Sequence, residues 1–397
     1  MRKSYFLFIL LSALILACGT AEEKSTGTTA ATELRFEVLD SLDLDFLGSP
    51  ILASTNPAGS KFGFYDYPSK KIIISDQSGE ILDTLSKTGD TPDSYGFMID
   101  LPVIWGNDKL IQVGMNGVFI YDQAGNMLKK ISHPEDMGGA AFMSITGKTS
   151  KIVEFDGVPY LLMNSIRTRD TYAGEQKFYD TYKAIEVVNL ETGETEDFGP
   201  FEEGSLFHNG NGFIQSDYLP AFAASKGKLY LSHGGEPKVW VYSFSPEKAT
   251  LDTALALDIP NLYPIEGIDR KELSEGSYSI SGVNAAIKNI FVQGGKILIS
   301  YYPGIDPLEM EEAEKLWMEG KEDEATVLYE KLQEKYPAGL LVYDEGSLEF
   351  LAQLNYPENT NKDGFLADDE FIYFPKTPDP DVEEDFLRIY KMKIVAK

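Results

Sequence analysis

A strand-turn-strand unit recurs along this sequence and limits the folds that the chain can adopt more than any other feature. In its clearest copy, Lys71–Leu85, apolar β-branched residues alternate up to an Asp-x-x-Gly corner, and a second alternating run follows. This is the sequence form of a β-hairpin, in which Asp closes the bend and Gly supplies a positive φ. Gly117–Ile131 repeats the design. Self-similarity along most of a chain is typical of a repeat architecture.

Looser copies of the hairpin continue to the end of the chain. They lie at Ala184–Phe198, Val239–Leu255 and Leu340–Leu354, with a half-copy at Leu387–Ala396. These copies predict about six blades of four short antiparallel strands, roughly at residues 50–87, 99–133, 141–199, 219–258, 281–355 and 363–396. The economical solution is an all-β fold, a β-propeller. Seven blades or an array of two-sheet sandwiches are the alternatives.

Leu34–Phe46 predicts one or two further strands ahead of the first full repeat. A strand in this position can pair with the last blade and close the ring, which removes the exposed sheet edges. We expect it to pair with Phe386–Val395.

Residues 1–17 predict a lipoprotein signal peptide. Arg2 and Lys3 precede an apolar run that is too short to span a bilayer comfortably, and the run ends in Ile15-Leu16-Ala17-Cys18. Cys18 is the only cysteine of the chain, so no intramolecular disulfide can form. The segment resembles a bacterial lipobox, in which the Cys thiol is acylated and anchors the protein to the membrane. An ordinary signal peptide with an incidental Cys is the alternative.

Residues 18–33 carry small and polar side chains and predict a flexible tether from the lipidated Cys18. Glu22 and Glu23 resemble the surface-export signal of Bacteroidota lipoproteins, with a solvated linker as the alternative. Residues 34–397 then form the propeller domain. We expect an outer-membrane lipoprotein on the periplasmic side or the cell surface.

The charge of the chain excludes one class of partner. Asp and Glu number 63 against 35 Lys and Arg, a formal net charge of −28. Such a surface repels nucleic-acid phosphates, so no nucleic acid is expected as a partner.

One segment, residues 307–337, departs from the β pattern. Between Leu308 and Tyr336 apolar residues recur at helical spacing on either side of Gly320, which predicts a helical hairpin inserted in the fifth blade. The segment resembles a single tetratricopeptide repeat, but one copy cannot stack into a solenoid. The hairpin either packs on its own blade or docks a partner protein through Leu316, Trp317 and Tyr329. It is also expected to stand near the mouth of the axial channel.

The lipobox, the hairpin repeat and the stretch from Lys87 to Gly96, KTGDTPDSYG, together resemble the Bacteroidota lipoproteins of the domain of unknown function 4221 family. More broadly, the chain is similar to six-bladed propeller lipoproteins of that phylum. The resemblance implies the propeller fold and brings no catalytic residues. The helical insertion departs from the family pattern.

The long connections predict where a site would lie. In a propeller, the loop after the second strand of each blade and the link to the next blade open on one face, and here the long connections fall on that face. They are Arg167–Thr181, Pro200–Leu219, Pro260–Ser281, Pro303–Ala338 and Lys376–Asp385. Functional residues concentrate on loops held by a rigid scaffold.

These loops and the adjoining strand ends carry aromatic, amide and guanidinium groups that suit a glycan or a protein surface. The candidate ligand-binding residues are Arg167, Arg169, Tyr172, Tyr179, His208, Asn209, Tyr218 and Tyr302. The alternative for the tyrosines is packing at the rim, and for the two arginines it is neutralisation of neighbouring carboxylates.

The sequence predicts no metal site and no cofactor. His133, His208 and His233 are far apart and have no ligand spacing. The corners at Asp76 and Asp122 lack the further acidic ligands of a calcium-binding loop. Their Asp and Gly residues are those typical of tight turns.

We therefore expect a lipid-anchored cell-envelope propeller that binds a glycan, peptide or membrane-protein partner through one loop-rich face, without catalysis. The alternatives are a propeller enzyme of the lactonase, lyase or hydrolase type, or an accessory subunit of an outer-membrane uptake complex. Fold alone does not separate these.

Anchoring depends on the thiol of Cys18. We predict that Cys18→Ser moves the protein into the soluble fraction of the cell and abolishes metabolic labelling by a fatty-acid probe. Labelling that persists in the variant would refute the lipobox.

Overall fold

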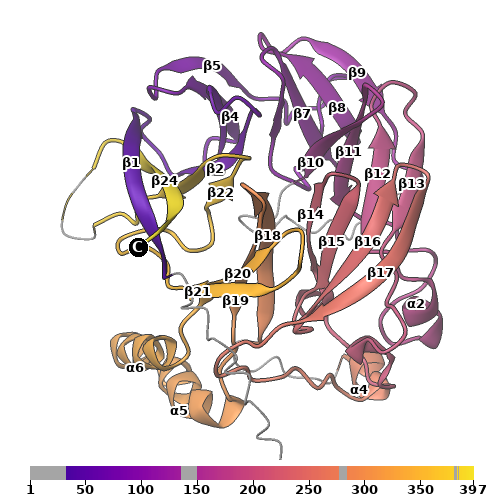
Figure 1. The fold of residues 1–397 in the computed structure, drawn as a ribbon, viewed down its shortest axis with the longest axis vertical. Coiled ribbons are helices and arrows are strands. Elements are labelled where there is room, and N and C mark those ends of the chain that lie inside the picture. Colours follow the sequence, from indigo (N-terminus) through magenta and orange to yellow (C-terminus); the bar gives the residue numbers. More distant parts are fainter. Residues whose placement is uncertain (1–32, 136–149, 277–283, 380–381, 383) are drawn as a thin grey trace, which may run out of the picture. The chain divides into compact units, whose positions relative to one another are not determined.

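Twenty-four strands form six four-stranded antiparallel sheets in the part of the chain that the structure describes. The computed structural model describes residues 33–135, 150–276, 284–379, 382 and 384–397. Figure 1 shows the sheets arranged as blades around an axis. The signal peptide, Cys18 and most of the tether lie outside the described residues.

The first three blades follow one another along the chain, each with its strands in sequential order from the axis outward. Their strands are β2 (Pro50–Thr55), β3 (Lys61–Asp66), β4 (Lys71–Asp76) and β5 (Ile81–Leu85); β6 (Val103–Trp105), β7 (Lys109–Gly114), β8 (Gly117–Asp122) and β9 (Met127–Ile131); β10 (Lys151–Phe155), β11 (Val158–Asn164), β12 (Ile185–Asn189) and β13 (Thr195–Phe198).

Blades four and five follow the same order. Blade six is different, because its outermost strand comes from the beginning of the described chain. Their strands are β14 (Pro220–Ser225), β15 (Lys228–His233), β16 (Lys238–Ser245) and β17 (Lys248–Ala256); β18 (Ala286–Gln293), β19 (Lys296–Tyr302), β20 (Gly339–Asp344) and β21 (Phe350–Leu354); β22 (Leu366–Ala367), β23 (Ile372–Pro375), β24 (Leu387–Ala396) and β1 (Leu34–Leu44).

The β-propeller predicted from the sequence is therefore confirmed, with six blades. Each hairpin copy forms the outer two strands of one blade, as β4 and β5 do at Lys71–Leu85. The half-copy at the C-terminus is β24, which lacks a following strand because β1 takes that place. The Asp-x-x-Gly corner at Asp76 is a hydrogen-bonded turn, as predicted. The Asp76 carboxylate accepts from the backbone N–H groups of Ser78 and Glu80, and Gly79 has a φ of +89°.

Adjacent blades pack face to face, and this explains the apolar runs in the middle strands. Each of the six neighbouring blade pairs shares a cluster of buried side chains. The inner strand pairs such as β3 and β4 are buried along almost their whole length, because both faces of a blade lie against a neighbour. The outer strands are less buried: β17 is mostly exposed, and β5 alternates between half-buried and exposed residues up to the buried Leu85.

The ring closes where β1 pairs antiparallel with β24, from Leu34 opposite Ala396 to Leu44 opposite Leu387. The predicted pairing of these two segments is confirmed. The Arg388 guanidinium donates two hydrogen bonds of 2.7 Å to the Asp43 carboxylate across the pair. This contact holds the pKa of Asp43 below its usual value.

The connections divide between the two faces of the ring as expected. The turns between the first and second strands and between the third and fourth strands of a blade are all short and lie on one face, which we call the short-turn face. The long connections lie on the other, the loop-rich face, together with the short turns between the middle strands of blades one, two and four. The loop-rich face carries the short helices of the described chain: α2 (Gln176–Thr181), η1 (Leu206–His208), α3 (Gln215–Tyr218) and α4 (Arg270–Glu275).

The predicted helical hairpin is present between β19 and β20, as α5 (Pro307–Met318) and α6 (Glu322–Lys335). Asp306 caps α5 by accepting from the Leu308 N–H, and Gly320 takes a φ of +73° at the turn. Met310, Ala313 and Leu332 pack with Tyr302 and Ile305 at the end of β19. The expected position over the axial channel is wrong: Figure 1 shows both helices at the outer edge of the ring, beside blade five.

None of the helices in the described ranges combines the length and the apolar composition needed to cross a membrane.

Ring closure by β1 can be tested by truncation. Deleting residues 1–47 should expose the edge of β24 and remove the buried side chains of Leu42 and Leu44, each worth about 1.5–3 kcal/mol of burial. We expect a lower Tm and an aggregated fraction in size-exclusion chromatography. Deletion of residues 1–32, which retains β1, is the control. Equal melting and elution of the two truncations would contradict the role of β1.

Candidate functional site

A pocket of about 300 Å³ lies on the loop-rich face and draws its walls from blades two, three and four. We call it the blade-three pocket. The continuous segment Met163–Arg169, where β11 ends and the loop toward α2 begins, supplies more lining residues than any other segment. Tyr218–Pro220 lead into β14 on one side, and Ile99, Asp100 and Val113 of the second blade complete the floor.

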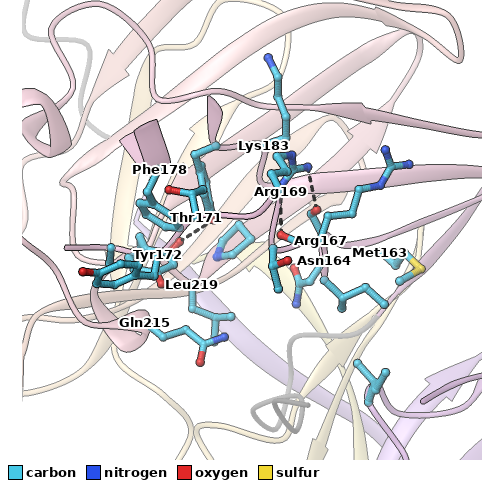
Figure 2. A pocket seen from close by; sticks show the side chains of 18 of the residues that line it. Met163, Asn164, Arg167, Arg169, Thr171, Tyr172, Phe178, Lys183, Gln215 and Leu219 are labelled. Atoms are coloured by element: carbon cyan, nitrogen blue, oxygen red, sulfur yellow. Dashed lines mark hydrogen bonds between the residues drawn. The ribbon is translucent and has the colours of Figure 1, made fainter. Parts of the chain in front are cut away.

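Aromatic rings form one wall of the blade-three pocket. Phe178 and Tyr182 come from α2 and the residue after it, Tyr218 comes from α3, and Tyr172 stands at the rim with 51% of its surface exposed. Tyr182 stacks on Phe201 with ring centroids 4.1 Å apart and an interplanar angle of 6°. Figure 2 shows Phe178 and Tyr172 on one side of the pocket and the two arginines on the other.

Behind this wall the rings continue as a buried cluster that fixes it in place. Its members include Phe201, Phe207 and Phe213, and the ring of His233 contacts it from the end of β15. His233 is fully buried and its Nε2 bonds to the Pro200 carbonyl oxygen at 3.1 Å. Burial lowers the pKa of His233 to about 3, so its ring is neutral in the folded protein.

Arg169 is held by several partners on the opposite side of the pocket. Its Nη2 donates to the Asp197 carboxylate at 2.8 Å and to Ser165 Oγ at 3.0 Å, and its Nη1 donates to the Arg167 carbonyl oxygen. Arg169 adopts a left-handed φ of +53°, a conformation that non-glycine residues take only where the surroundings impose it. The hydrogen bonds supply that constraint.

Arg167 is bound less completely. Its guanidinium lies 3.6 Å from Glu186 and 3.4 Å from Asp197, which are ion-pair distances. Its Nε is buried and has no hydrogen-bond acceptor among the described residues. In the Glu186 carboxylate, Oε1 accepts from the Ile166 N–H and from Ser165 Oγ, and Oε2 is the oxygen that lies 3.6 Å from Arg167 Nε. Arg167 therefore retains donor capacity beside the pocket.

Within the described chain, Asn164 has an unsatisfied acceptor, whereas Arg167 has an unsatisfied donor. Asn164 is the last residue of β11 and lines the pocket, and its buried Oδ1 has no donor among the residues that the structure describes. A buried polar atom without a partner is unusual and costs about 1–3 kcal/mol. The pocket thus holds one donor and one acceptor that the described chain does not satisfy.

Both arginines of the pocket are paired with carboxylates, and Lys183 lines the pocket as a further cation. Arg167 and Arg169 face Glu186 and Asp197, and Asp100 on the floor accepts from the Leu101 and Ser150 N–H groups. The expectation that the two arginines neutralise neighbouring carboxylates is confirmed by these pairs. The two arginines therefore have no need of an anionic ligand.

The eight candidate ligand-binding residues do not form one site. Arg167, Arg169, Tyr172 and Tyr218 line the blade-three pocket. Tyr179 lies behind its wall, 1% exposed, with its hydroxyl donating to the Ala173 carbonyl oxygen and accepting from the Phe213 N–H.

The other three candidates lie elsewhere. His208 and Asn209 are exposed on the link between blades three and four, where Asn209 donates to the Glu266 carbonyl oxygen. Tyr302 is buried beneath the helical hairpin.

Sequence reasoning missed Asn164, Phe178 and Tyr182. The aromatic spacing Phe178, Tyr179, Tyr182 was a usable signal, because residues three and four apart share one side of a helical turn. Asn164 gave no signal, since nothing in the sequence shows that a strand-end amide lacks a partner.

The hairpin residues proposed for partner docking differ in exposure. Trp317 is 38% exposed and contacts the Tyr329 ring at 5.7 Å, whereas Leu316 and Tyr329 are half-buried. Their docking role stays a prediction.

Within the described ranges, no group of His, Cys, Asp and Glu side chains is arranged to hold a metal ion. The acidic loop at 379–385 lies partly outside those ranges.

The six four-stranded blades define the chain as a six-bladed β-propeller. It is similar in structure to a member of the DUF4221 family from Bacteroides vulgatus, with a TM-score of 0.59 and 11% identity over 92% of this chain and 100% of that one. At this identity the likeness shows a shared fold, and in that respect the resemblance inferred from the sequence is confirmed.

Weaker likenesses extend to other propellers. A gluconolactonase from Xanthomonas campestris gives a TM-score of 0.42 at 11% identity over 91% of each chain. Regucalcin, a calcium-binding protein from Agrobacterium tumefaciens, gives 0.40 at 11% identity over 91% of this chain and 95% of that one. No family model and no curated protein matches the sequence.

The buried ring of His233 makes stability depend on pH. The unfolded chain protonates this residue below its ordinary pKa of 6.5, whereas the folded protein does so only near 3. The stability is complete above pH 6.5 and falls as the pH drops toward 3. Between pH 7 and pH 5 we expect a loss of about 2 kcal/mol from this residue.

The measurement is urea unfolding at both pH values for the natural protein and for His233→Phe, in which the loss should be smaller by that amount. His208→Gln removes an exposed histidine and is the matched control, expected to behave like the natural protein. The same pH dependence in His233→Phe would contradict the assignment.

Proposed function

We propose that this protein is a lipid-anchored cell-envelope propeller that binds a neutral glycan in the blade-three pocket. The observation that carries the proposal is the pairing of an unsatisfied donor at Arg167 with an unsatisfied acceptor at Asn164 beside an aromatic wall. A sugar hydroxyl donates and accepts at once, so neighbouring hydroxyls on one ring can serve both atoms.

The walls of the pocket favour a saccharide over other polar ligands. The C–H face of a sugar ring is apolar and packs against aromatic side chains, and Phe178, Tyr182 and Tyr172 offer such surfaces. Arg167 and Arg169 are paired with Glu186 and Asp197, so neither guanidinium is left to select a carboxylate or phosphate, and Lys183 is a further cation in the pocket lining. A volume of about 300 Å³ is at the small end for ligand pockets and accommodates a single ring better than an extended chain.

The anchoring half of the proposal rests on residues outside the described part of the chain. A signal peptide at 1–17, acylation of Cys18 and a tether through residue 33 would place the propeller at the outer membrane, on its periplasmic side or at the cell surface. β1 begins at Leu34, directly after the expected tether. At the cell surface the propeller would meet an external glycan directly, and on the periplasmic side it would meet a glycan of the periplasm.

Asn164→Ala tests the binding half. The substitution removes an acceptor that no described residue satisfies, so Tm should stay level or rise slightly, while affinity for the glycan should fall about tenfold. Residues 33–397 would be screened against arrayed neutral oligosaccharides, acidic oligosaccharides and short peptides. The best binder would then be titrated by calorimetry.

Asn126→Ala is the matched control. Asn126 lies in a short turn on the opposite face, where its Nδ2 donates to Asp122. We expect it to leave affinity unchanged. Binding of peptides alone, or of a glycan with equal affinity to all three proteins, would overturn the proposal.

A further inference from the structure

A second cavity lies inside the ring, on its axis. It has a volume of about 270 Å³ and is lined by the inner strands of blades one, two, three and six. Ser54 and Asn56 come from the end of β2, Ile104 from β6, and Leu366 from β22. Asp368 and Asp369, in the short turn after β22, belong to its lining as well, so the cavity extends toward the short-turn face. We call it the axial cavity.

Lys151 is the one lysine among the residues that line the axial cavity. It begins β10, the innermost strand of blade three, and its side chain reaches across the axis to blade five. There its Nζ lies 4.3 Å from the centroid of the Phe291 ring, which is itself buried. Within the described ranges its ammonium has no ion pair and no hydrogen bond to a side chain or carbonyl group.

The surroundings of Lys151 favour the neutral amine. Removal from water penalises the charged form and lowers the pKa of Lys151 to about 8, against an ordinary value of 10.5. Asp100, at the end of the link into blade two, opposes this effect only in part, because its carboxylate already accepts from Ser150 and Leu101. At this pKa about one tenth of the amine is unprotonated at pH 7, and about half at pH 8.

The charges at the turn after β22 indicate which ligands the cavity would admit. Asp368 is engaged by the N–H groups of Glu370 and Phe371 and by the Tyr373 hydroxyl, and Asp369 follows it in the same turn. β2 and β6 contribute no charged residue to the cavity. Two carboxylates repel anions, and Ile104 and Leu366 offer apolar surface in the lining, so a neutral molecule is favoured.

We propose that Lys151 is a nucleophilic amine that condenses with a neutral aldehyde in the axial cavity. The lone pair on Nζ attacks the carbonyl carbon and forms a carbinolamine after a proton moves from nitrogen to oxygen. Loss of the hydroxyl group as water then leaves a C=N bond to Nζ. No electrons are exchanged with another reagent, so the step needs only the amine and the aldehyde.

The proposal is tested by competitive labelling of the folded residues 33–397 with limiting formaldehyde and cyanoborohydride, followed by peptide mass spectrometry. The reductant converts each imine into a stable methylamine, so the label at each lysine reports its rate. Lys109 is the matched control: its ammonium lies 4.4 Å from the Trp105 ring, but it does not line the axial cavity.

At pH 8 we expect Lys151 to be labelled at least about tenfold faster than Lys109, because burial leaves about half of the Lys151 amine unprotonated at that pH. The rate at Lys151 should rise with a midpoint near pH 8. Lys151→Met should remove the fast-labelled peptide and leave the rate at Lys109 unchanged. A rate at Lys151 at or below that of Lys109, or a midpoint near 10.5, would overturn the proposal.

Propanal replaces formaldehyde in a second experiment, which asks whether the cavity admits more than a one-carbon reagent. We expect the same preference for Lys151. Fast labelling by formaldehyde and none by propanal would overturn the claim that the cavity takes a substrate. The outcome does not depend on glycan binding in the blade-three pocket, since Lys151 does not line that pocket.

Discussion

Pairing of β1 with β24 is the contact on which the ring depends. A chain of blades laid out in a row would leave the outer edge of the sixth blade unpaired, and a free sheet edge is a site of aggregation. Here the strand after Glu33 supplies that edge, and its Leu42 and Leu44 enter the packing between blades six and one. Once the ring is closed, every blade has two neighbours. The apolar character of the middle strands follows from that arrangement.

Closure also limits where chemistry can reside. The blade faces are filled by one another, so polar groups able to meet a ligand are confined to strand ends, loops and the axis. The blade-three pocket uses the first two, with the end of β11 on one side and the aromatic loop cluster on the other. The axial cavity uses the third. The two cavities differ in chemistry: the blade-three pocket has an aromatic wall and two arginines paired with carboxylates, and the axial cavity has a single lysine among its described lining residues.

Much of the architecture could be predicted because strands and turns follow from short, local patterns in the sequence. The hairpin at Lys71–Leu85 and its copies carry strand alternation and turn residues together, and those fix blade number and strand order. The direction in which a loop side chain points cannot be predicted from such local patterns. Tyr179 and Tyr182 are three residues apart, yet one lies behind the pocket wall and the other lines the pocket. The encounter of Lys151 with Phe291 depends on the geometry of the whole ring, so no segment of sequence reveals it.

The two ends of the described chain leave the ring at one place, where Lys397 N–H donates to the Glu33 carbonyl oxygen at 2.7 Å. A pulling force applied through residues before Glu33 is therefore delivered directly to the closing strand pair, at the end where Leu34 faces Ala396. The other five blades are connected in sequence and carry that load only after the pair has opened. The strand pair that completes the ring is thus also the first contact that such a force would load.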